Sequence, residues 1–211
     1  LARGINKAKL DLKVIAQVMS GGVEGYSATG FYARKGDVSK IEDLKGKVIA
    51  VNALGSSIDA AVQAQLGRLG WKPSRDYQVA EVRFSAMLPA LLSKRVDLAP
   101  LLTPFELMAL RKGGVAKIFT MRQALGATET LQWIGKADWI AKHRAALVDF
   151  LEDNIRLRKW LYNPSNRGQV LATLSKVTKR PAKNYASWAF TKKDSYREPN
   201  GLTNVPRMQK N

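Results

Sequence analysis

The sequence predicts an α/β fold, in which strands and helices alternate along the chain. Short unbroken apolar stretches, such as residues 48–51, are typical of strands covered on both faces. Within a few residues after such a stretch, apolar residues recur at helical spacing, and glycine or proline marks the end of each predicted helix. With 211 residues and 45% hydrophobic content, the chain can bury a substantial core, as one large domain or two small lobes.

The clearest unit lies between residues 47 and 69. Val48–Val51 is the predicted strand, Asn52 interrupts it, and Ser56 with Asp59 three residues later fits a capping box, so a helix is predicted to start after Ser56. Gly70 is the predicted stop. The residues expected on the apolar face of this helix are Ile58, Ala61, Val62, Leu66 and Leu69.

The first turn of this helix is a candidate anion site. The leading N–H groups of a helix have no partner inside it and lie at the positive end of its dipole. Gly55 allows close backbone approach, and the hydroxyls of Ser56 and Ser57 can add donors. In the alternative interpretation the Gly-Ser loop only caps the helix. Neither nucleotide-binding fingerprint is met, because no phosphate-loop lysine follows the serines and no spaced glycine triplet is present.

The remaining elements follow the same rhythm. Strands are predicted at 10–18 and 26–34, with Ser20-Gly21-Gly22 as a loop between them, and residues 39–46 form a single-turn connector. Further along, the pattern predicts strands at 77–83, 96–102 and 115–120 and helices at 85–95 and 105–111. Because ligands collect at the carboxyl ends of strands in open α/β sheets, the loops at 52–57 and 102–104 are expected to face one cleft.

The last third of the chain is predicted to be mainly helical. Residues 121–134 read as irregular, Asp138 is expected to cap one long helix that ends before Asn163-Pro164, and shorter helices are predicted at 170–178 and 181–190. A turn-rich extended segment is expected at 196–206. Ile140, Leu147, Phe150, Leu151, Ile155, Leu157 and Leu161 are predicted to mark the buried side of the long helix.

Composition limits the function classes. The chain has no cysteine, which excludes disulfides and thiol chemistry, and the single His143 has no apparent catalytic or metal-binding partner. The formal net charge is +18. The basic residues are scattered without interleaved aromatics, which disfavours nucleic acid as a binding partner. Electrostatic steering of a small anion is one explanation of the charge. No apolar run is long enough to cross a bilayer and residues 1–20 lack the pattern of a signal peptide, yet the chain reads as a piece of a longer protein.

A family resemblance rests on residues 40–51 followed by Gly55-Ser56-Ser57. This phrase resembles the type II periplasmic solute-binding proteins, in the branch that serves sulfonate, taurine, nitrate and thiamine-precursor ABC importers. Residues 91–97 stand where that family has a Leu-x-x-Gly-x-Val-Asp phrase, and residues 194–210 are similar to its C-terminal Tyr-x-x-Pro-Asn-Gly segment. Two departures stand out: Arg95 replaces the glycine, and Leu102-Thr103 replaces an aromatic-acidic pair that often contacts ligand.

The resemblance implies a two-lobed α/β fold of the type II periplasmic-binding-protein kind, each lobe a mixed sheet flanked by helices. Lobe one would comprise residues 1–36 and 124–211, lobe two residues 37–123, and hinge bending would close them around the ligand. Lobe one would be incomplete, without its first strand and helix, so we expect marginal stability or poor solubility for these residues expressed alone.

These arguments predict a binding protein, and not an enzyme, that captures a small organic or oxyanionic solute for an ABC transporter permease. We expect a periplasmic or otherwise exported monomer without cofactor, metal or nucleic acid. An enzyme on the same fold, of the desulfinase or pyrimidine-synthase type, is the alternative. The predicted ligand contacts are Ser20, Gly21, Asn52, Gly55, Ser56, Ser57, Thr103 and Glu129.

Overall fold

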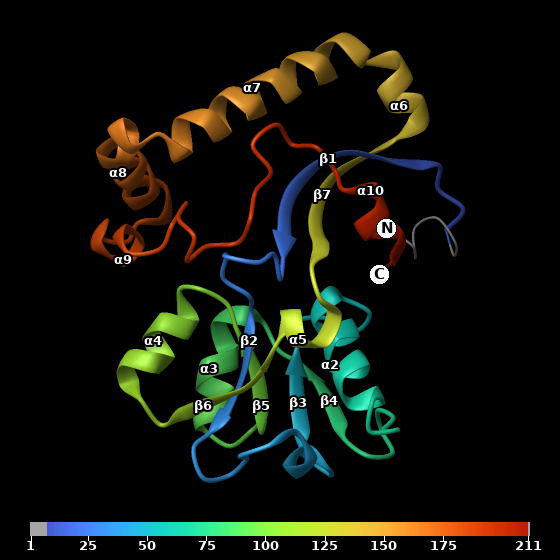
Figure 1. Cartoon of the computed structure of the whole chain (residues 1–211), viewed down its shortest axis with the longest axis vertical. Helices are drawn as coiled ribbons and strands as arrows, with labels where there is room; N and C mark the ends of the chain where they lie inside the picture. The colour runs from blue at the N-terminus through green and yellow to red at the C-terminus, as the bar shows by residue number, and fades with distance from the viewer. Residues whose placement is uncertain (1–7, 211) are drawn as a thin grey trace. The chain divides into compact units, whose positions relative to one another are not determined.

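The computed structural model describes residues 8–210, and the chain divides into two compact units (Figure 1). Unit 1 consists of the chain up to Ser20 and from Thr128 onward, and unit 2 is Gly21–Ala127. The expected boundaries at residues 36 and 123 differ from these. The first boundary comes earlier because strand β2 (Gly30–Arg34) pairs inside the sheet of unit 2.

Unit 2 is built on a five-stranded sheet with the order β4-β3-β5-β2-β6. Strand β3 (Val48–Val51) runs parallel to β4 (Gln78–Glu81) and β5 (Leu98–Leu101), whereas β2 is antiparallel to β5 and β6 (Val115–Thr120). The sheet is therefore mixed, as predicted.

Both faces of this sheet are covered, because successive side chains of a strand point to opposite sides. Phe31 and Ala33 pack in one core and Tyr32 in the other, and all three are fully buried. Helices α2 (Ser57–Gly67) and α5 (Met121–Leu125) contribute to the first core, and α3 (Phe84–Leu92) and α4 (Phe105–Lys112) to the second. The short 3₁₀ turn η1 (Ile41–Leu44) leads into β3 and buries Leu44.

The Val96-Asp97 pair has a structural role at the start of β5. The Asp97 carboxylate accepts a 3.0 Å bond from the Arg34 guanidinium and a 2.9 Å bond from the Val48 amide. Arg34 also donates to the carbonyls of Leu91 and Val96. Three neighbouring segments of backbone are thus tied together by one ion pair, and Asp97 is not available for a ligand.

Unit 1 combines a two-stranded sheet with a run of helices. Its strands are β1 (Leu12–Gly21) and β7 (Thr128–Lys136). Its helical segments are α6 (Ala137–Lys142), α7 (Arg144–Tyr162), η2 (Pro164–Asn166), α8 (Arg167–Thr178), α9 (Lys183–Ala186) and α10 (Val205–Lys210).

Gln17 and Arg158 form the polar centre of unit 1. The Arg158 guanidinium donates to the backbone carbonyls of Gln17 and Glu198, and the Gln17 side chain accepts from the Glu198 amide at 2.8 Å. Both side chains are buried, and burial lowers the pKa of Arg158 below its ordinary value. This one arginine joins α7, β1 and the C-terminal segment.

Two sequence-based strand predictions in the first 34 residues need correction. Strand β1 continues through Ser20 and Gly21, where a loop was expected, because the Ser20 amide donates to the Tyr196 carbonyl at 2.9 Å. Strand β2 begins only at Gly30 and not at residue 26. The Arg122 guanidinium binds the carbonyls of Gly22, Val23 and Tyr26, and this fixes the preceding segment as a loop.

The prediction of an irregular stretch at 121–134 is wrong. Thr120 and Gln123 form a reciprocal capping box that starts α5, with a 2.8 Å bond from the Thr120 amide to the Gln123 side chain. Gly126, at φ +73°, then ends that helix and Thr128 begins β7.

The predicted long helix is two helices, because the backbone leaves helical geometry at His143 (φ −121°, ψ 31°). Lys136, not Asp138, is the N-cap of the first of these. On α7 the residue that is buried is Arg158, whereas Phe150 and Leu157 are 40% and 51% exposed. Leu69, expected on the buried face of α2, is likewise exposed, because that helix ends at Gly67.

Within residues 8–210, no helix combines the length and the apolar character that a membrane span requires.

The position of Arg158 generates a test of stability. Arg158→Met keeps the length of the side chain but removes the Arg158 donor to the Gln17 carbonyl and one of the two donors to the Glu198 carbonyl, which also accepts from the Gly201 amide. We therefore expect a loss of about 2–4 kcal/mol in urea unfolding. Arg156→Met on the same helix is the control, because Arg156 pairs with carboxylates on the exposed surface and should change stability by about 0.5 kcal/mol or less. Equal effects of the two variants would contradict the anchoring role.

Candidate functional site

The start of α2 is the best-defined candidate site in unit 2. Ser56 is the N-cap, as predicted: its hydroxyl accepts from the Asp59 amide at 3.3 Å and donates to the Asn52 side chain at 2.9 Å. Gly55 adopts φ +73°, the left-handed conformation that glycine allows, which turns the chain into the helix. The predicted loop of small residues therefore forms a capped helix start.

Several of the donors that the sequence suggested already have acceptors. The Ser56 amide bonds the Ala53 carbonyl, and the Gly55 amide bonds the Asp59 carboxylate at 2.6 Å. The predicted capping box is therefore displaced by one residue, because the Asp59 carboxylate accepts from the Gly55 amide and not from the amide of the N-cap Ser56. In the described part of the chain, the amides of Ser57 and Ile58 and the exposed Ser57 hydroxyl remain for a ligand.

Carboxylates surround this helix start. Asp59 lies in the first turn and is 3% exposed, and Glu81 at the end of β4 accepts a 2.6 Å bond from the Leu54 amide. Both negative charges offset the positive end of the helix dipole. The electrostatic potential at the start of α2 is therefore less positive than the sequence motif alone suggests.

The loop at Thr103 lies at the same edge of the unit 2 sheet. Because β3 and β5 are parallel neighbours, their carboxyl ends reach one edge, which places Asn52 and Thr103 after adjacent strands. Thr103 is half-buried and precedes Pro104 through a cis peptide bond.

Behind this loop, a cluster built on the buried Tyr32 and Glu106 holds α4 on the sheet. The Tyr32 hydroxyl donates to the Glu106 carboxylate, and the Lys117 ammonium lies 3.1 Å from the same oxygen. Burial, followed by the bond to Glu106, raises the pKa of Tyr32 far above its ordinary value. Sequence reasoning missed this cluster, because its members lie on three separate elements.

In unit 1, the structure brings together two of the predicted residues that are 109 positions apart. The Ser20 hydroxyl donates to Glu129 Oε1 at 2.8 Å and accepts from the Gln17 side chain at 2.8 Å. Arg207 Nη1 donates to the same Glu129 oxygen at 2.9 Å. Gly21 is the last residue of β1, directly after Ser20. Arg207 and Gln17 were not predicted, since only the pairing of distant segments reveals them.

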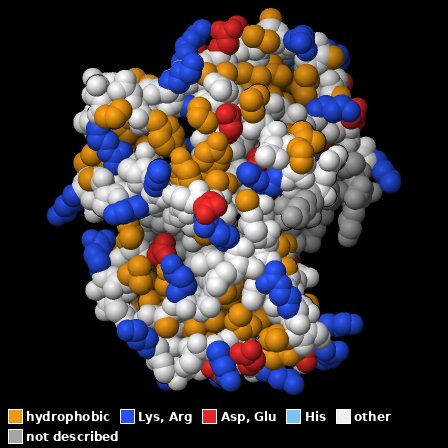
Figure 2. Space-filling model, in the orientation of Figure 1, with side chains coloured by type: hydrophobic (Ala, Val, Ile, Leu, Met, Phe, Trp, Pro, Cys, Tyr) orange, Lys and Arg blue, Asp and Glu red, His pale blue; other side chains and the backbone are white. Residues whose placement is uncertain are grey.

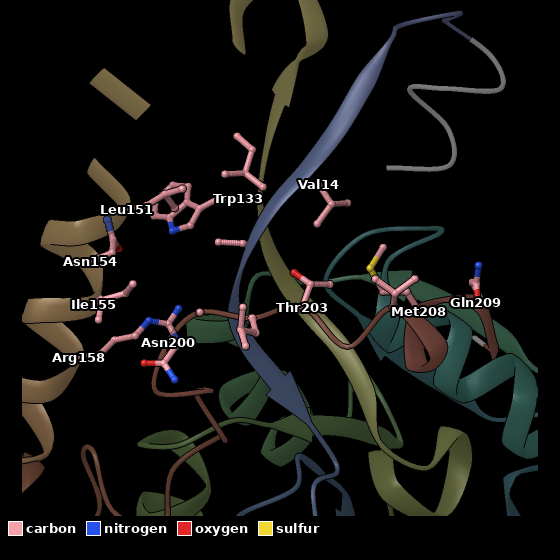
Figure 3. Close-up of a pocket in the computed structure, with 15 residues that line it drawn as sticks. Val14, Trp133, Leu151, Asn154, Ile155, Arg158, Asn200, Thr203, Met208 and Gln209 are labelled. Atoms are coloured by element: carbon pink, nitrogen blue, oxygen red, sulfur yellow. The ribbon is translucent and has the colours of Figure 1, made fainter. Parts of the chain in front are cut away.

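A separate pocket of about 520 Å³ lies in unit 1, lined by side chains of β1, β7, α7 and the C-terminal segment (Figure 3). Its wall is mainly apolar and includes Trp133, whose ring meets that of Phe150 edge-on with the ring centroids 5.2 Å apart. Two of its polar side chains already bind backbone carbonyls, since Arg158 donates to the Glu198 carbonyl and Asn154 to the Phe150 carbonyl. The buried Thr203 hydroxyl, in contrast, has no partner among the described residues. None of the predicted ligand contacts lines this pocket.

The surface shows no single basic stripe on the face in view. Figure 2 shows Lys and Arg side chains spread over that face, with hydrophobic and acidic side chains between them. This distribution gives the nucleic-acid interpretation no support there, because backbone contacts to nucleic acid need a continuous positive surface.

Among the described residues, no group of three or more His, Asp or Glu side chains could hold a metal ion. His143 lies at the break between α6 and α7, with its ring 4.9 Å from that of Trp139. No catalytic constellation is built around it in the described residues.

Comparison with protein families gives one match. The model of the NMT1/THI5-like family matches residues 6–156. No curated protein sequence matches significantly.

Solved structures share the fold at low sequence identity. The periplasmic aliphatic sulphonate-binding protein SsuA from Escherichia coli is 21% identical over 87% of this chain, with a TM-score of 0.63. The periplasmic nitrate-binding protein NrtA from Synechocystis PCC 6803 is 14% identical over 95%, with a TM-score of 0.62. A ligand-binding component of an ABC-type import system from Staphylococcus aureus is 14% identical over 95%, with a TM-score of 0.65.

The chain covers 60%, 57% and 67% of these three proteins, respectively. The type II periplasmic-binding-protein fold predicted from the sequence is thereby confirmed.

The N-cap suggests a first test of the site. Ser56→Ala removes the acceptor for the Asp59 amide and the donor to Asn52, so we expect about 1 kcal/mol of destabilisation in urea unfolding. Ser57→Ala, one residue later, should leave stability within about 0.5 kcal/mol, because its exposed hydroxyl does not cap the helix. A larger loss in Ser57→Ala than in Ser56→Ala would reverse the assignment of the cap.

The buried tyrosine gives a pH test. Tyr32 has a raised pKa in the folded protein, so its contribution to stability is present below the unfolded pKa of about 10 and falls as the pH rises above it. Tyr32→Phe should lose about 1–2 kcal/mol at pH 8, and its gap to the wild type should narrow at pH 11. Tyr77→Phe is the control, because burial also raises the pKa of Tyr77 but its hydroxyl has no partner among the described residues. That variant should cost less at pH 8, and a pH-independent gap for Tyr32→Phe would refute the assignment.

Proposed function

Because the chain belongs to the NMT1/THI5-like family, we propose that it is part of the solute-binding component of an ABC importer. The solute is small and organic or oxyanionic, and the start of α2 supplies hydrogen-bonding groups to it. It is captured and released without chemical change. A transporter permease is the partner, the protein is exported to the periplasm or an equivalent compartment, and it acts as a monomer.

The observation that carries this proposal is the start of α2. Two backbone amides and one hydroxyl, those of Ser57 and Ile58, are available at a sheet edge that also holds the Thr103 loop. Preformed neutral donors of this kind bind the oxygen atoms of a solute through short hydrogen bonds, each contributing about 1.5–3 kcal/mol when the partner is charged. The E. coli and Synechocystis neighbours are named for binding sulphonate and nitrate, which supports the same class of interaction.

A ligand screen tests the function itself. Thermal-shift assays with sulfonates, nitrate, bicarbonate, pyrimidines and aromatic acids should yield at least one stabilising solute, since a ligand at 100 times its Kd stabilises the folded state by about 2.7 kcal/mol. No stabilisation in the whole panel, combined with turnover of an ester, sulfinate or phosphate, would instead favour an enzyme.

Two substitutions at Ser57 test the site. Ser57→Ala removes one donor and should weaken binding of the stabilising solute about tenfold. Ser57→Asp should nearly abolish it, because a third carboxylate beside Asp59 and Glu81 repels acceptor atoms at the helix start. Both variants should remain folded. Calorimetric titration measures the affinities, and unchanged affinity in both variants would move the site elsewhere.

A further inference from the structure

The net charge of the chain is concentrated in one part of unit 1. Residues 154–193 contain ten of the 35 Lys and Arg residues and no Asp or Glu, whereas the whole chain has a formal net charge of +18. This stretch therefore carries +10, more than half of the total. Charges that serve solubility alone are spread over a surface with both signs interspersed, so this distribution indicates a local role.

Three of the ten cations have structural roles. Arg158 and Arg167 donate to backbone carbonyls, and Arg156 pairs with Glu152 and Asp153. Six others, between residues 176 and 193, are all exposed and form no ion pair with any described residue. We call these six the basic patch: Lys176, Lys179, Arg180, Lys183, Lys192 and Lys193.

The local fold brings the basic patch together. Helix α8 ends at Lys179, which adopts a left-handed conformation (φ 56°) and reverses the chain. The Tyr185 hydroxyl of α9 donates to the Thr178 hydroxyl at 2.8 Å, so α9 lies beside the end of α8 (Figure 1). Arg167 holds the segment after α9 by donating to the Ala189 carbonyl at 2.7 Å. The end of α8, the start of α9 and the turn that follows α9 therefore belong to one part of the surface of unit 1.

The carboxylates that flank this stretch in the sequence are already engaged. Asp194 is buried, and it accepts from Arg197 at 3.0 Å and from the Phe190 amide at 3.0 Å. Asp153, at the other end of the stretch, pairs with Arg156 at 2.9 Å. These carboxylates leave the charge of the basic patch uncompensated, and the patch attracts an anionic partner.

The residue types in the basic patch disfavour a protein partner. Five of its six cations are lysines, a residue that is depleted in protein–protein interfaces, whereas arginine and aromatic residues are enriched there. Lysine is also a mobile point charge and lacks the planar fork with which arginine binds a carboxylate through two hydrogen bonds.

The aromatic side chains of the same stretch disfavour single-stranded nucleic acid. Tyr185 is buried, the Trp188 ring packs on it, and the Phe190 ring meets that of Tyr162 edge-on. These rings are engaged inside unit 1, whereas proteins that hold single strands need aromatic rings on which the bases stack.

One large apolar side chain lies among the cations. Val177 is 73% exposed and stands in the sequence between Lys176 and Lys179. Clusters of roughly four to eight Lys and Arg residues are typical of surfaces that bind anionic lipid headgroups. An exposed aliphatic side chain beside such a cluster can enter the boundary between headgroups and acyl chains.

We propose that the basic patch docks the protein on a membrane that carries anionic phospholipids. The cations contact the headgroup phosphates, and Val177 enters the headgroup boundary. This inference goes beyond the proposed solute-binding function, because it assigns a second partner to a surface that includes none of the groups at the start of α2.

Co-sedimentation with vesicles tests the proposal. Phosphatidylcholine vesicles with about 30 mol% phosphatidylglycerol should bind the wild-type chain about tenfold or more tighter than vesicles of phosphatidylcholine alone. Raising the NaCl concentration from about 50 to about 300 mM should weaken that binding about tenfold or more, because salt screens the attraction. Equal binding to both kinds of vesicle, or none to the anionic vesicles, overturns the proposal.

A triple variant locates the docking surface. Replacing three cations of the patch should weaken binding to anionic vesicles about tenfold or more, because each Lys or Arg near the surface contributes a factor of about five: Lys176→Gln, Lys179→Gln and Arg180→Gln. The matched control removes the same charge from three exposed lysines of unit 2 and should change binding about twofold at most: Lys45→Gln, Lys72→Gln and Lys112→Gln. An equal loss in both triple variants overturns the assignment to the patch. Should the first variant fail to unfold cooperatively, Lys192→Gln with Lys193→Gln carries the same test.

Val177→Ser separates a bilayer from other polyanions. It should weaken vesicle binding about threefold, because a serine gains nothing from entering the headgroup boundary. Val148→Ser is the control, since Val148 is an exposed valine of α7 outside the patch, and it should leave binding unchanged. Unchanged binding of Val177→Ser overturns the insertion of Val177.

The rival partners are tested in the same buffer. A mixed-sequence DNA duplex and a poly-glutamate peptide should each bind more weakly than the anionic vesicles, and tighter binding of either one overturns the membrane assignment. None of these measurements includes a solute, so their failure is distinct from a negative result in the ligand screen.

Discussion

The fold of unit 2 depends on burying both faces of one mixed sheet. Strands β3, β5 and β2 alternate their side chains between two cores, so helices must cover each face: α2 and α5 cover one, and α3 and α4 the other. Each strand therefore ends in a loop at an edge of the sheet. The start of α2 and the Thr103 loop meet at the same edge because β3 and β5 are parallel, so the position of the candidate site follows from the arrangement of the core.

Unit 1 meets a different constraint, the pairing of buried polar groups. Its two strands provide little regular hydrogen bonding beyond their own ladder, and side chains supply the rest. Arg158 donates to carbonyls of β1 and of the C-terminal segment. The Gln17 side chain donates to the Ser20 hydroxyl, which in turn donates to Glu129. The series continues from Glu129 to Arg207 on α10. A network of buried and partly buried side chains therefore links segments that lie far apart in the sequence, and it holds Oε1 of Glu129.

The two candidate contact regions share one chemical feature. Asp59 in unit 2 and Glu129 in unit 1 are buried carboxylates, and each keeps one oxygen without a partner among the described residues. A buried carboxylate oxygen without a partner keeps the cost of its desolvation. In unit 2, the donors of Ser57 and Ile58 lie in the same first turn of α2 as Asp59.

The sequence by itself determined the α/β class, the strand at Val48–Val51, the cap at Ser56 and the family, because these follow from local periodicity, capping chemistry and a continuous motif. It also placed Ser20 and Glu129 in one predicted site. Tertiary structure alone decided the rest. Helix α5 and strand β7 replaced a supposed irregular stretch, and β1 continued through the supposed loop at Ser20, because its partner is Tyr196 in the C-terminal segment. Which oxygen of Glu129 is free and which donors of the α2 loop are occupied depend on side chains that meet only after folding, and no local pattern in the sequence records such meetings.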